Sequence, residues 1–285
     1  MISSGDKETT QETITMKALL EAGVHFGHPT QRWHPRMNQY IFAQRNGIHI
    51  IDLQQSMSLL ERAAAFVRDL VSNGETVLFV GTKRQAQDPI EQAANKCGMF
   101  YVRNRWLGGM LTNFHTIQRR IEHLIRLEDE KDKGTLAVLT KKEGLKKEEE
   151  LGRLNRNFGG VKKMNRIPGA IFIVDIGQEK IAVEEGRKMN IPIVALVDTD
   201  CDPDLVDYPI AANDDAIRSI NLVANYISDA VIEGMTRREL QVSSIDTESQ
   251  ENNADIVDAD TSQEAEIESG VDNRVLDSSS EPEVQ

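Results

Sequence analysis

The first residues that could do chemistry are three histidines within ten positions near the N-terminus: His25, His28 and His34. Histidines this close together could hold a transition metal. No cysteine or carboxylate lies nearby, however, and the spacing fits no standard zinc pattern. A metal would need carboxylates from a later Asp-rich stretch, so the candidate ligands are His28 and Asp198, and whether a metal is bound stays open. We expect no cofactor.

The same N-terminal stretch suits RNA better than a metal. Residues 25–45 hold three arginines and no acidic residue, and aromatic side chains lie between them. Guanidinium groups bind phosphates, and planar rings stack on exposed bases. The alternative, in which the rings only pack on a sheet, stays open. The RNA-binding candidates in this stretch are Arg32, Trp33, His34, Arg36 and Arg45.

A glycine followed by two cations stands at a predicted strand-to-helix junction, in Gly81 to Arg84. The spacing differs from that of a phosphate loop, so tight nucleotide binding is not expected. Cations at the start of a helix oppose its dipole unless a phosphate binds between them and the free N–H groups. We therefore expect Lys83 and Arg84 to contact the RNA backbone, with two solvated cations as the alternative.

A third basic motif follows the next predicted strand. Arg103 and Arg105 alternate and so share a face, and Trp106 precedes the glycine pair at 108–109, which permits tight backbone geometry. From residue 83 to 126 there are eight basic and three acidic residues, a net charge of +5. Counterion release at phosphates would supply affinity for RNA there. Arg103, Arg105 and Trp106 complete the RNA-binding candidates.

An acidic stretch, residues 198–207, supports a competing prediction. It fails as a calcium loop, because Pro203 and Pro209 stand where glycine and glutamate are needed. Asp175 and Asp198 each end a predicted strand, where α/β enzymes place catalytic groups. The alternative function is therefore a nucleotide- or metal-handling enzyme that uses these two acids. Strand-end aspartates also cap the turn or helix that follows, and no other catalytic motif is present.

Five short apolar segments are predicted strands, and none alternates with polar residues. Near-continuous apolarity predicts strands covered on both faces, as in a parallel sheet. Segments with helical spacing separate them, which predicts a doubly wound α/β sheet. The predicted strands are 76–80, 100–102, 170–174, 193–197 and 208–210.

Residues 111–162 differ, because they are rich in Lys, Arg and Glu and carry two sparse apolar stripes. This pattern predicts an antiparallel helical hairpin, a coiled coil, that projects from the sheet domain; a helix pair packed on the surface is the alternative. The end of the chain is polar, acidic and poor in aromatic residues, which predicts disorder. The predicted parts are a polar leader at 1–14, the α/β domain at 15–110 and 163–236, the inserted hairpin at 111–162 and the disordered tail at 237–285.

The formal net charge of −13 argues against an RNA partner, but its distribution does not. Residues 241–285 contain 13 acidic residues and one basic residue, so they carry −12. Residues 1–240 then hold 33 acidic and 32 basic residues, a net charge of −1. Two cysteines give no disulfide framework, the N-terminus lacks the apolar run of a signal peptide, and no segment is apolar enough to span a membrane.

Long ordered motifs occur at 20–28, 45–53, 78–84, 105–113, 168–175 and 198–219. In these motifs the sequence resembles the bacterial-type small ribosomal subunit protein two, the universal uS-two family, over about residues 15–236. The resemblance implies a flavodoxin-like sheet with strand order 2-1-3-4-5 and a helical hairpin inserted after the second strand. It also implies no catalytic activity and no small-molecule substrate.

The expected function is that of a structural constituent of the small ribosomal subunit. The resemblance implies a cytoplasmic, ribosome-bound protein that contacts small-subunit ribosomal RNA and neighbouring ribosomal proteins. In bacteria these neighbours are expected to include the large messenger-binding protein one. No membrane contact is expected. By position, the basic and aromatic candidates named above are the expected RNA-facing set.

Overall fold

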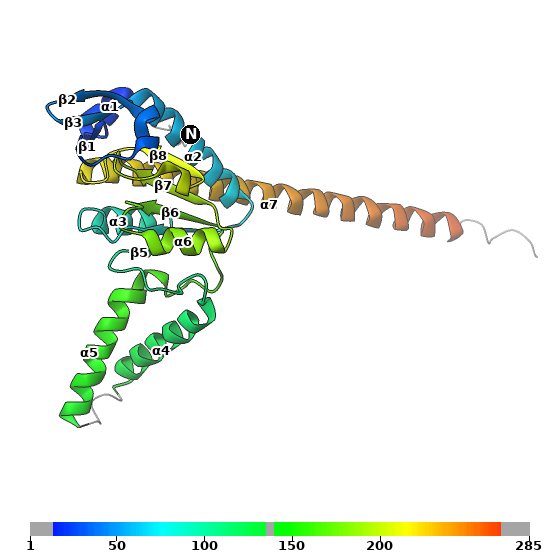
Figure 1. The fold of residues 1–285 in the computed structure, drawn as a ribbon. Coiled ribbons are helices and arrows are strands. Elements are labelled where there is room, and N and C mark those ends of the chain that lie inside the picture. Colours follow the sequence, from blue (N-terminus) through cyan, green and yellow to red (C-terminus); the bar gives the residue numbers. More distant parts are fainter. Residues whose placement is uncertain (1–13, 135–139, 269–285) are drawn as a thin grey trace, which may run out of the picture. The chain divides into compact units, whose positions relative to one another are not determined.

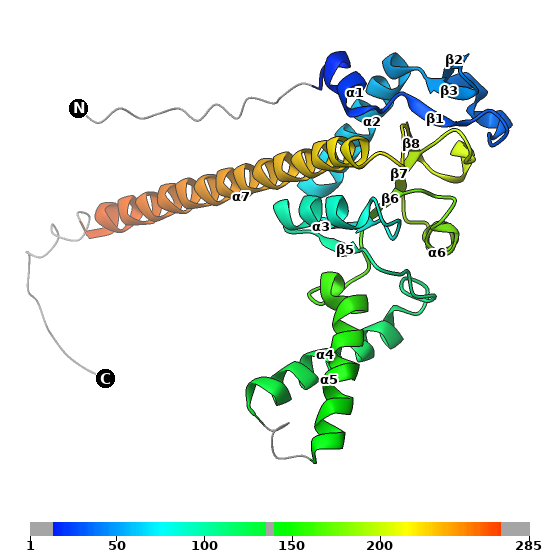
Figure 2. The same cartoon turned by 90° about the vertical axis from the view of Figure 1, so that its left-hand side faces the viewer.

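The computed structural model describes residues 14–134 and 140–268. Contacts within the chain divide it into two units, Met1–Arg238 and Glu239–Gln285. The first unit contains two sheets, and each has its own strand order and direction (Figures 1 and 2).

The larger sheet has five parallel strands in the order β5-β4-β6-β7-β8. Every residue of β4, β6 and β7 is buried, because helices cover both faces. This confirms the predicted α/β class with a five-stranded parallel sheet. The strand bounds are β4 (Val77–Val80), β5 (Phe100–Val102), β6 (Ala170–Val174), β7 (Ile193–Val197) and β8 (Tyr208–Ala211).

Alternating residues of these strands enter two separate apolar cores. Leu78, Ile171 and Ile193 pack on one side of the sheet, while Phe79, Phe172 and Val194 pack on the other. The first core includes side chains of α6 (Lys180–Lys188) and of the helical hairpin. The second includes side chains of α1 (Met16–Ala22), α2 (Leu53–Ser72), α3 (Gln87–Lys96) and α7 (Ile217–Glu268).

The smaller sheet is antiparallel and was absent from the predicted elements. It has the order β1-β3-β2 and consists of β1 (Phe26–Pro29), β2 (Ile41–Arg45) and β3 (Ile48–Ile51). The 3-10 helix η1 (Pro35–Tyr40) leads into β2. A turn at Asn46 and Gly47 with positive φ angles of 52° and 75° joins β2 to β3, a geometry suited to a tight hairpin. This sheet lies next to β8, at the opposite end of the unit from the hairpin helices (Figures 1 and 2).

The helices α4 (Phe114–Asp132) and α5 (Lys141–Phe158) pack on each other between β5 and β6 in the chain. Their shared stripe buries Ile117, Ile121, Leu124 and Leu127 of α4 with Leu151, Leu154 and Phe158 of α5. Two apolar residues of the hairpin, Ile125 and Leu145, are exposed instead. The short 3-10 helix η3 (Gly159–Val161) ends the hairpin on the β5 side.

Helix α7 crosses the boundary at residue 237 that was predicted for the tail. No glycine or proline occurs between Gly234 and Gly270 to break it. From 236 to 243 every side chain is exposed, so this part of α7 packs on no core. Residues 237–268 of the predicted disordered tail therefore belong to helix α7. Residues 269–285 of the predicted tail and residues 1–13 of the predicted polar leader lie outside the described part. None of the described helices has the length and apolar character needed to cross a membrane.

Candidate nucleic-acid interface

Acidic side chains gather where the strands β6, β7 and β8 end, and His28 of β1 joins them. The Nδ1 atom of His28 lies 3.1 Å from Oδ2 of Asp198, and its Nε2 atom lies 3.5 Å from Asp215. The hydrogen bond to Asp198 raises the pKa of His28 to about 9 despite its burial. The predicted metal candidates, His28 and Asp198, therefore do meet, and with Asp214 their ligand atoms lie within 4.8 Å of one another.

Lys83 lies in this acidic cluster and not on the surface. Its Nζ atom is 2.6 Å from Asp214, 2.7 Å from Asp215 and 3.2 Å from Asp175. Burial would lower the pKa of Lys83, but these carboxylates outweigh it and raise the pKa above its ordinary value. Burial, with the negative charges of Asp198 and Asp175, raises the pKa of Asp214 to about 8. The amine predicted to meet a phosphate thus meets carboxylates of its own chain.

The two strand-end acids of the enzyme alternative have structural partners. Asp175 pairs with Lys83, and its Oδ1 accepts the backbone N–H of Gln178. Asp198 is buried, and its oxygens accept the backbone N–H groups of Thr199 and Asp214. Their carboxylate oxygens accept backbone N–H groups of the turn that follows and of a neighbouring loop, as a capping role requires.

The loop after β4 also binds an anion from its own chain. Glu179 is 3% exposed, and its Oε1 accepts the backbone N–H of Thr82 at 3.0 Å and the Thr82 hydroxyl. Burial raises the pKa of Glu179 against the effect of these hydrogen bonds. A carboxylate thus takes the place at this strand-to-helix junction that the sequence suggested for a phosphate.

The loop between β5 and α4 surrounds a second buried carboxylate, that of Glu185 on α6. Its Oε1 accepts the N–H of Gly109 at 2.7 Å and the indole N–H of Trp106 at 3.2 Å. Its Oε2 accepts the N–H of Leu111 at 3.0 Å and both donors of Thr112 at 3.1 Å. Burial alone would raise the pKa of Glu185, but the backbone donors outweigh it, and the pKa lies below its ordinary value.

Trp106 is therefore a core residue and not an exposed stacking platform. It is 6% exposed and belongs to the core that α6 and the hairpin share. Its placement and that of Lys83 correct the predicted RNA-facing set. Both side chains satisfy buried groups of the protein, which the type and spacing of the residues alone do not reveal.

Three more candidates have partners within the chain. Arg36 lies 2.9 Å from Asp202 and 3.0 Å from Asp204. His34 accepts the N–H of Arg36 through Nδ1 and is 4.0 Å from Asp202 through Nε2. Arg103 donates to Glu91, which also accepts from Tyr101.

The remaining candidates face solvent. In the part of the chain with described side chains, no hydrogen bond or ion pair engages the side chains of four arginines, all of them exposed: Arg32, Arg45, Arg84 and Arg105. Trp33 is 40% exposed and rests on the ring of His49 with centroids 5.5 Å apart. The four guanidinium groups can bind phosphates without first losing an ion-pair partner, and the exposed part of the Trp33 ring can stack on a base.

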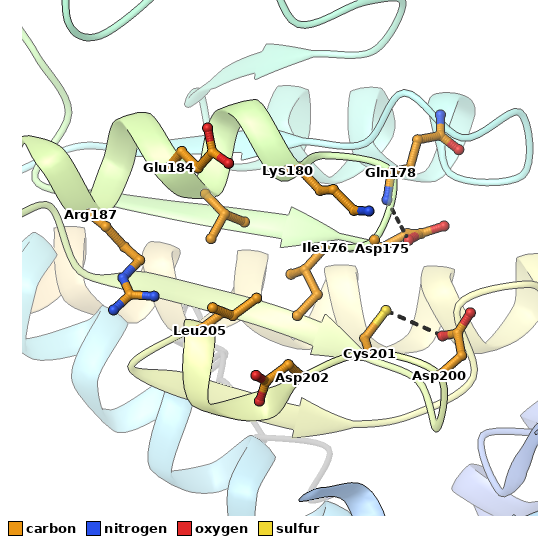
Figure 3. A pocket seen from close by; sticks show the side chains of 12 residues that line it. Asp175, Ile176, Gln178, Lys180, Glu184, Arg187, Asp200, Cys201, Asp202 and Leu205 are labelled. Atoms are coloured by element: carbon orange, nitrogen blue, oxygen red, sulfur yellow. Dashed lines mark hydrogen bonds between the residues drawn. The ribbon is translucent and has the colours of Figure 1, made fainter. Parts of the chain in front are cut away.

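A surface pocket with a volume of about 660 Å³ lies between α6 and the segment that contains η4 (Pro203–Leu205). Figure 3 shows the side chains that line it. Lys180 and Arg187 line one side, and Asp200 and Asp202 line the other. The Cys201 thiol donates to Asp200, and burial raises its pKa, which keeps it protonated. The pocket has apolar walls and charges of both signs, and none of the RNA-binding candidates lines it.

Two carboxylates of the site, Glu179 and Glu185, were absent from the predicted residues. A signal for Glu185 exists in the sequence, since it stands beside Ala182 and Gly186 on the apolar face of a short helix. An acid on an apolar face is rarely buried unless it has partners. The partners themselves, more than 70 positions away in the chain, could not be inferred from this signal.

Comparisons with known proteins agree over most of the chain. Residues 19–234 match the family described as ribosomal protein S2. The chain is 52% identical to small ribosomal subunit protein uS2 of Dehalococcoides mccartyi over 235 residues, which cover 82% of the chain and 95% of that protein. It is 57% identical to the uS2 protein of Chloroflexus aurantiacus over 227 residues, 80% of the chain and 95% of the relative.

Proposed function

Because this chain belongs to the ribosomal protein S2 family, we propose that it acts in translation as a structural constituent of the small ribosomal subunit and not as an enzyme. The observation that carries this conclusion is the match over residues 19–234, together with 52–57% identity to proteins of that name. The chain then works on ribosomes in the cytoplasm, where it binds ribosomal RNA and other ribosomal proteins.

The proposed RNA-facing set contains five exposed side chains without an ion-pair partner: Arg32, Trp33, Arg45, Arg84 and Arg105. Phosphate contacts by free cations release counterions, and this release supplies affinity that falls as salt rises. Arginines that already pair with carboxylates gain less, since a phosphate must displace the partner first. His34, Arg36 and Arg103 are for this reason secondary members of the set.

The neighbours of this protein are proposed from the resemblance to its family. They include the large messenger-binding protein one. The flavodoxin-like architecture with an inserted coiled coil belongs to the same proposal. The order β5-β4-β6-β7-β8 and the packing of α4 on α5 support it.

Sedimentation through a sucrose gradient tests the proposed function. The full chain is expected to migrate with small ribosomal subunits and to leave them at high salt. The double variant Arg32→Ala/Arg45→Ala should weaken binding and reduce the slope of log affinity against log salt by about two. A chain found only in the free fraction at low salt would contradict the proposal.

A further inference from the structure

Glu185 holds its charge without a cation. Its residue is 7% exposed, and in the part of the chain with described side chains no lysine, arginine or histidine forms an ion pair with it. Five donors from one loop surround the two oxygens instead. Three are backbone N–H groups, a nest of the kind that binds anions. The loop therefore depends on this carboxylate for its conformation.

The donors lie along the whole loop between β5 and α4. Trp106 anchors its beginning, Gly109 its middle and Thr112 its end, two residues before Phe114 starts α4. The φ angle of Gly109 is +88°, a conformation that other residues adopt only with strain. One side chain of α6 thus fixes both the loop and the start of the hairpin.

The outer side of this loop is basic and solvent-exposed. Residues 103–121 contain four arginines and no acidic residue. Arg105 directly precedes the anchored Trp106, and its side chain has no ion pair among the described residues. Arg119 and Arg120 are exposed in the first turns of α4. The same loop therefore turns its backbone donors toward Glu185 and its free cation toward solvent.

We propose that Glu185 is a positioning residue for RNA binding: its ionised carboxylate fixes the 105–112 loop so that Arg105 meets an RNA phosphate. This inference rests on the proposed function. Glu185 touches no RNA itself and acts through Arg105. Loss of its charge should then weaken RNA binding only as far as Arg105 contributes to that binding.

A double-mutant cycle on the full chain tests this. The probe is the small ribosomal subunit from the same source, stripped of this protein at high salt. Glu185→Gln keeps the size of the side chain and removes its charge, and Glu184→Gln is the matched control because Glu184 is exposed on the same helix. We expect Glu185→Gln to weaken binding about tenfold and to lower the salt slope by about one, while Glu184→Gln changes neither.

The dependence on Arg105 separates positioning from simple destabilisation. In an Arg105→Ala background, Glu185→Gln should weaken binding by a further factor of less than three. Additive effects of the two substitutions, or wild-type affinity and salt slope in a folded Glu185→Gln variant, would overturn the inference alone. Failure of the wild-type chain to bind would overturn the proposed function, and this inference with it.

A milder variant covers the case in which Glu185→Gln does not fold. Trp106→Phe together with Thr112→Val removes two side-chain donors and leaves the carboxylate and the backbone N–H groups in place. It should weaken binding by a smaller factor and lose that effect in the Arg105→Ala background. An equal effect with and without Arg105 would contradict the proposal.

Discussion

Two regions of this protein carry basic motifs of similar composition, but individual cations of these motifs differ in whether they pair with carboxylates of the same chain. At the ends of the parallel strands, Lys83 and the loop donors around residues 82 and 109 meet carboxylates of the same chain. On the small antiparallel sheet and in the segment between β1 and η1, Arg45 and Arg32 meet none among the described residues. A cation in a motif therefore indicates an anion, but the motif does not say whose anion it is.

The difference follows from the position of each region in the fold. The strand ends of a parallel sheet are surrounded by loops from other strands, and here these loops supply Asp175, Asp198 and Asp214. The small sheet has a free outer strand, β2, in which four of five residues are exposed. Partner counting, which means listing the carboxylates of the same chain that pair with each cation, thus separates structural cations from cations that are free to bind RNA.

Among the tests of this comparison, the substitution Lys83→Met should have the largest effect on stability. It leaves three carboxylates without their cation, and breaking a buried pair in this way costs about 4 kcal/mol. The melting temperature should fall by roughly 10 °C. Arg84→Met, the exposed neighbour, should change stability by less than about 0.5 kcal/mol. Equal melting temperatures for the two variants would show that Lys83 is solvated like Arg84.

Glu185→Ala should have the next largest effect on stability. It removes the acceptor of five donors, and each buried donor left without a partner costs about 1–3 kcal/mol unless water replaces it. We expect the free energy of unfolding, measured with urea, to fall by about 3 kcal/mol. Glu184→Ala should leave it nearly unchanged. A loss below 1 kcal/mol would mean that the loop keeps its conformation without the carboxylate.

The acidic cluster should make stability depend on pH in a direction opposite to ordinary acid denaturation. The hydrogen bond to Asp198 raises the pKa of His28 from 6.5 to about 9. The folded state then binds the proton more tightly, so this contribution is complete below pH 6.5 and is lost as pH rises to about 9.

Between pH 6.5 and 9 the free energy of unfolding should fall by on the order of 2 kcal/mol. His28→Asn should flatten this dependence, while His25→Asn should not, because burial lowers the pKa of His25. The measurement is urea unfolding at several pH values. A slope that survives in His28→Asn would assign the proton to another group, for which Asp214 is the first candidate.

Much of the sheet could be predicted from the sequence, and the reason is physical. The segments 100–102, 170–174 and 193–197 are strands with those bounds, since burial on both faces leaves a continuous apolar run. The small sheet was missed because its strands are short and partly exposed, although Asn46 and Gly47 form a hairpin signal.

The site was harder to predict, because its ion pairs join distant segments. Lys83 and Asp214 are 131 positions apart. A local pattern identifies a cation at a helix start but not the loop that folds over it. Arg45 is exposed, as its place in a polar stretch suggests, and its contact with RNA stays a prediction.

Trp33→Ala tests the exposed side of the comparison. Stacking of one base on an aromatic ring contributes about 1–3 kcal/mol to binding. We therefore expect about a tenfold weaker affinity for stripped small subunits, with the salt slope unchanged because no charge is lost. Phe66→Ala is a useful contrast, since its ring stacks on Tyr208 within the protein and should affect stability instead. An unchanged affinity for Trp33→Ala would remove this ring from the proposed set.

The smallest expected effect is also the most informative, because Arg36 lies on the boundary between the two regions. It is 55% exposed, yet it lies within 3.0 Å of both Asp202 and Asp204. A surface ion pair of this kind contributes less than about 1 kcal/mol to stability. If the pair persists on the subunit, Arg36→Ala should weaken binding less than threefold, against about tenfold for Arg45→Ala. If the two losses are equal, a phosphate displaces the aspartates, and partner counting then applies only to buried pairs such as Lys83 with Asp214.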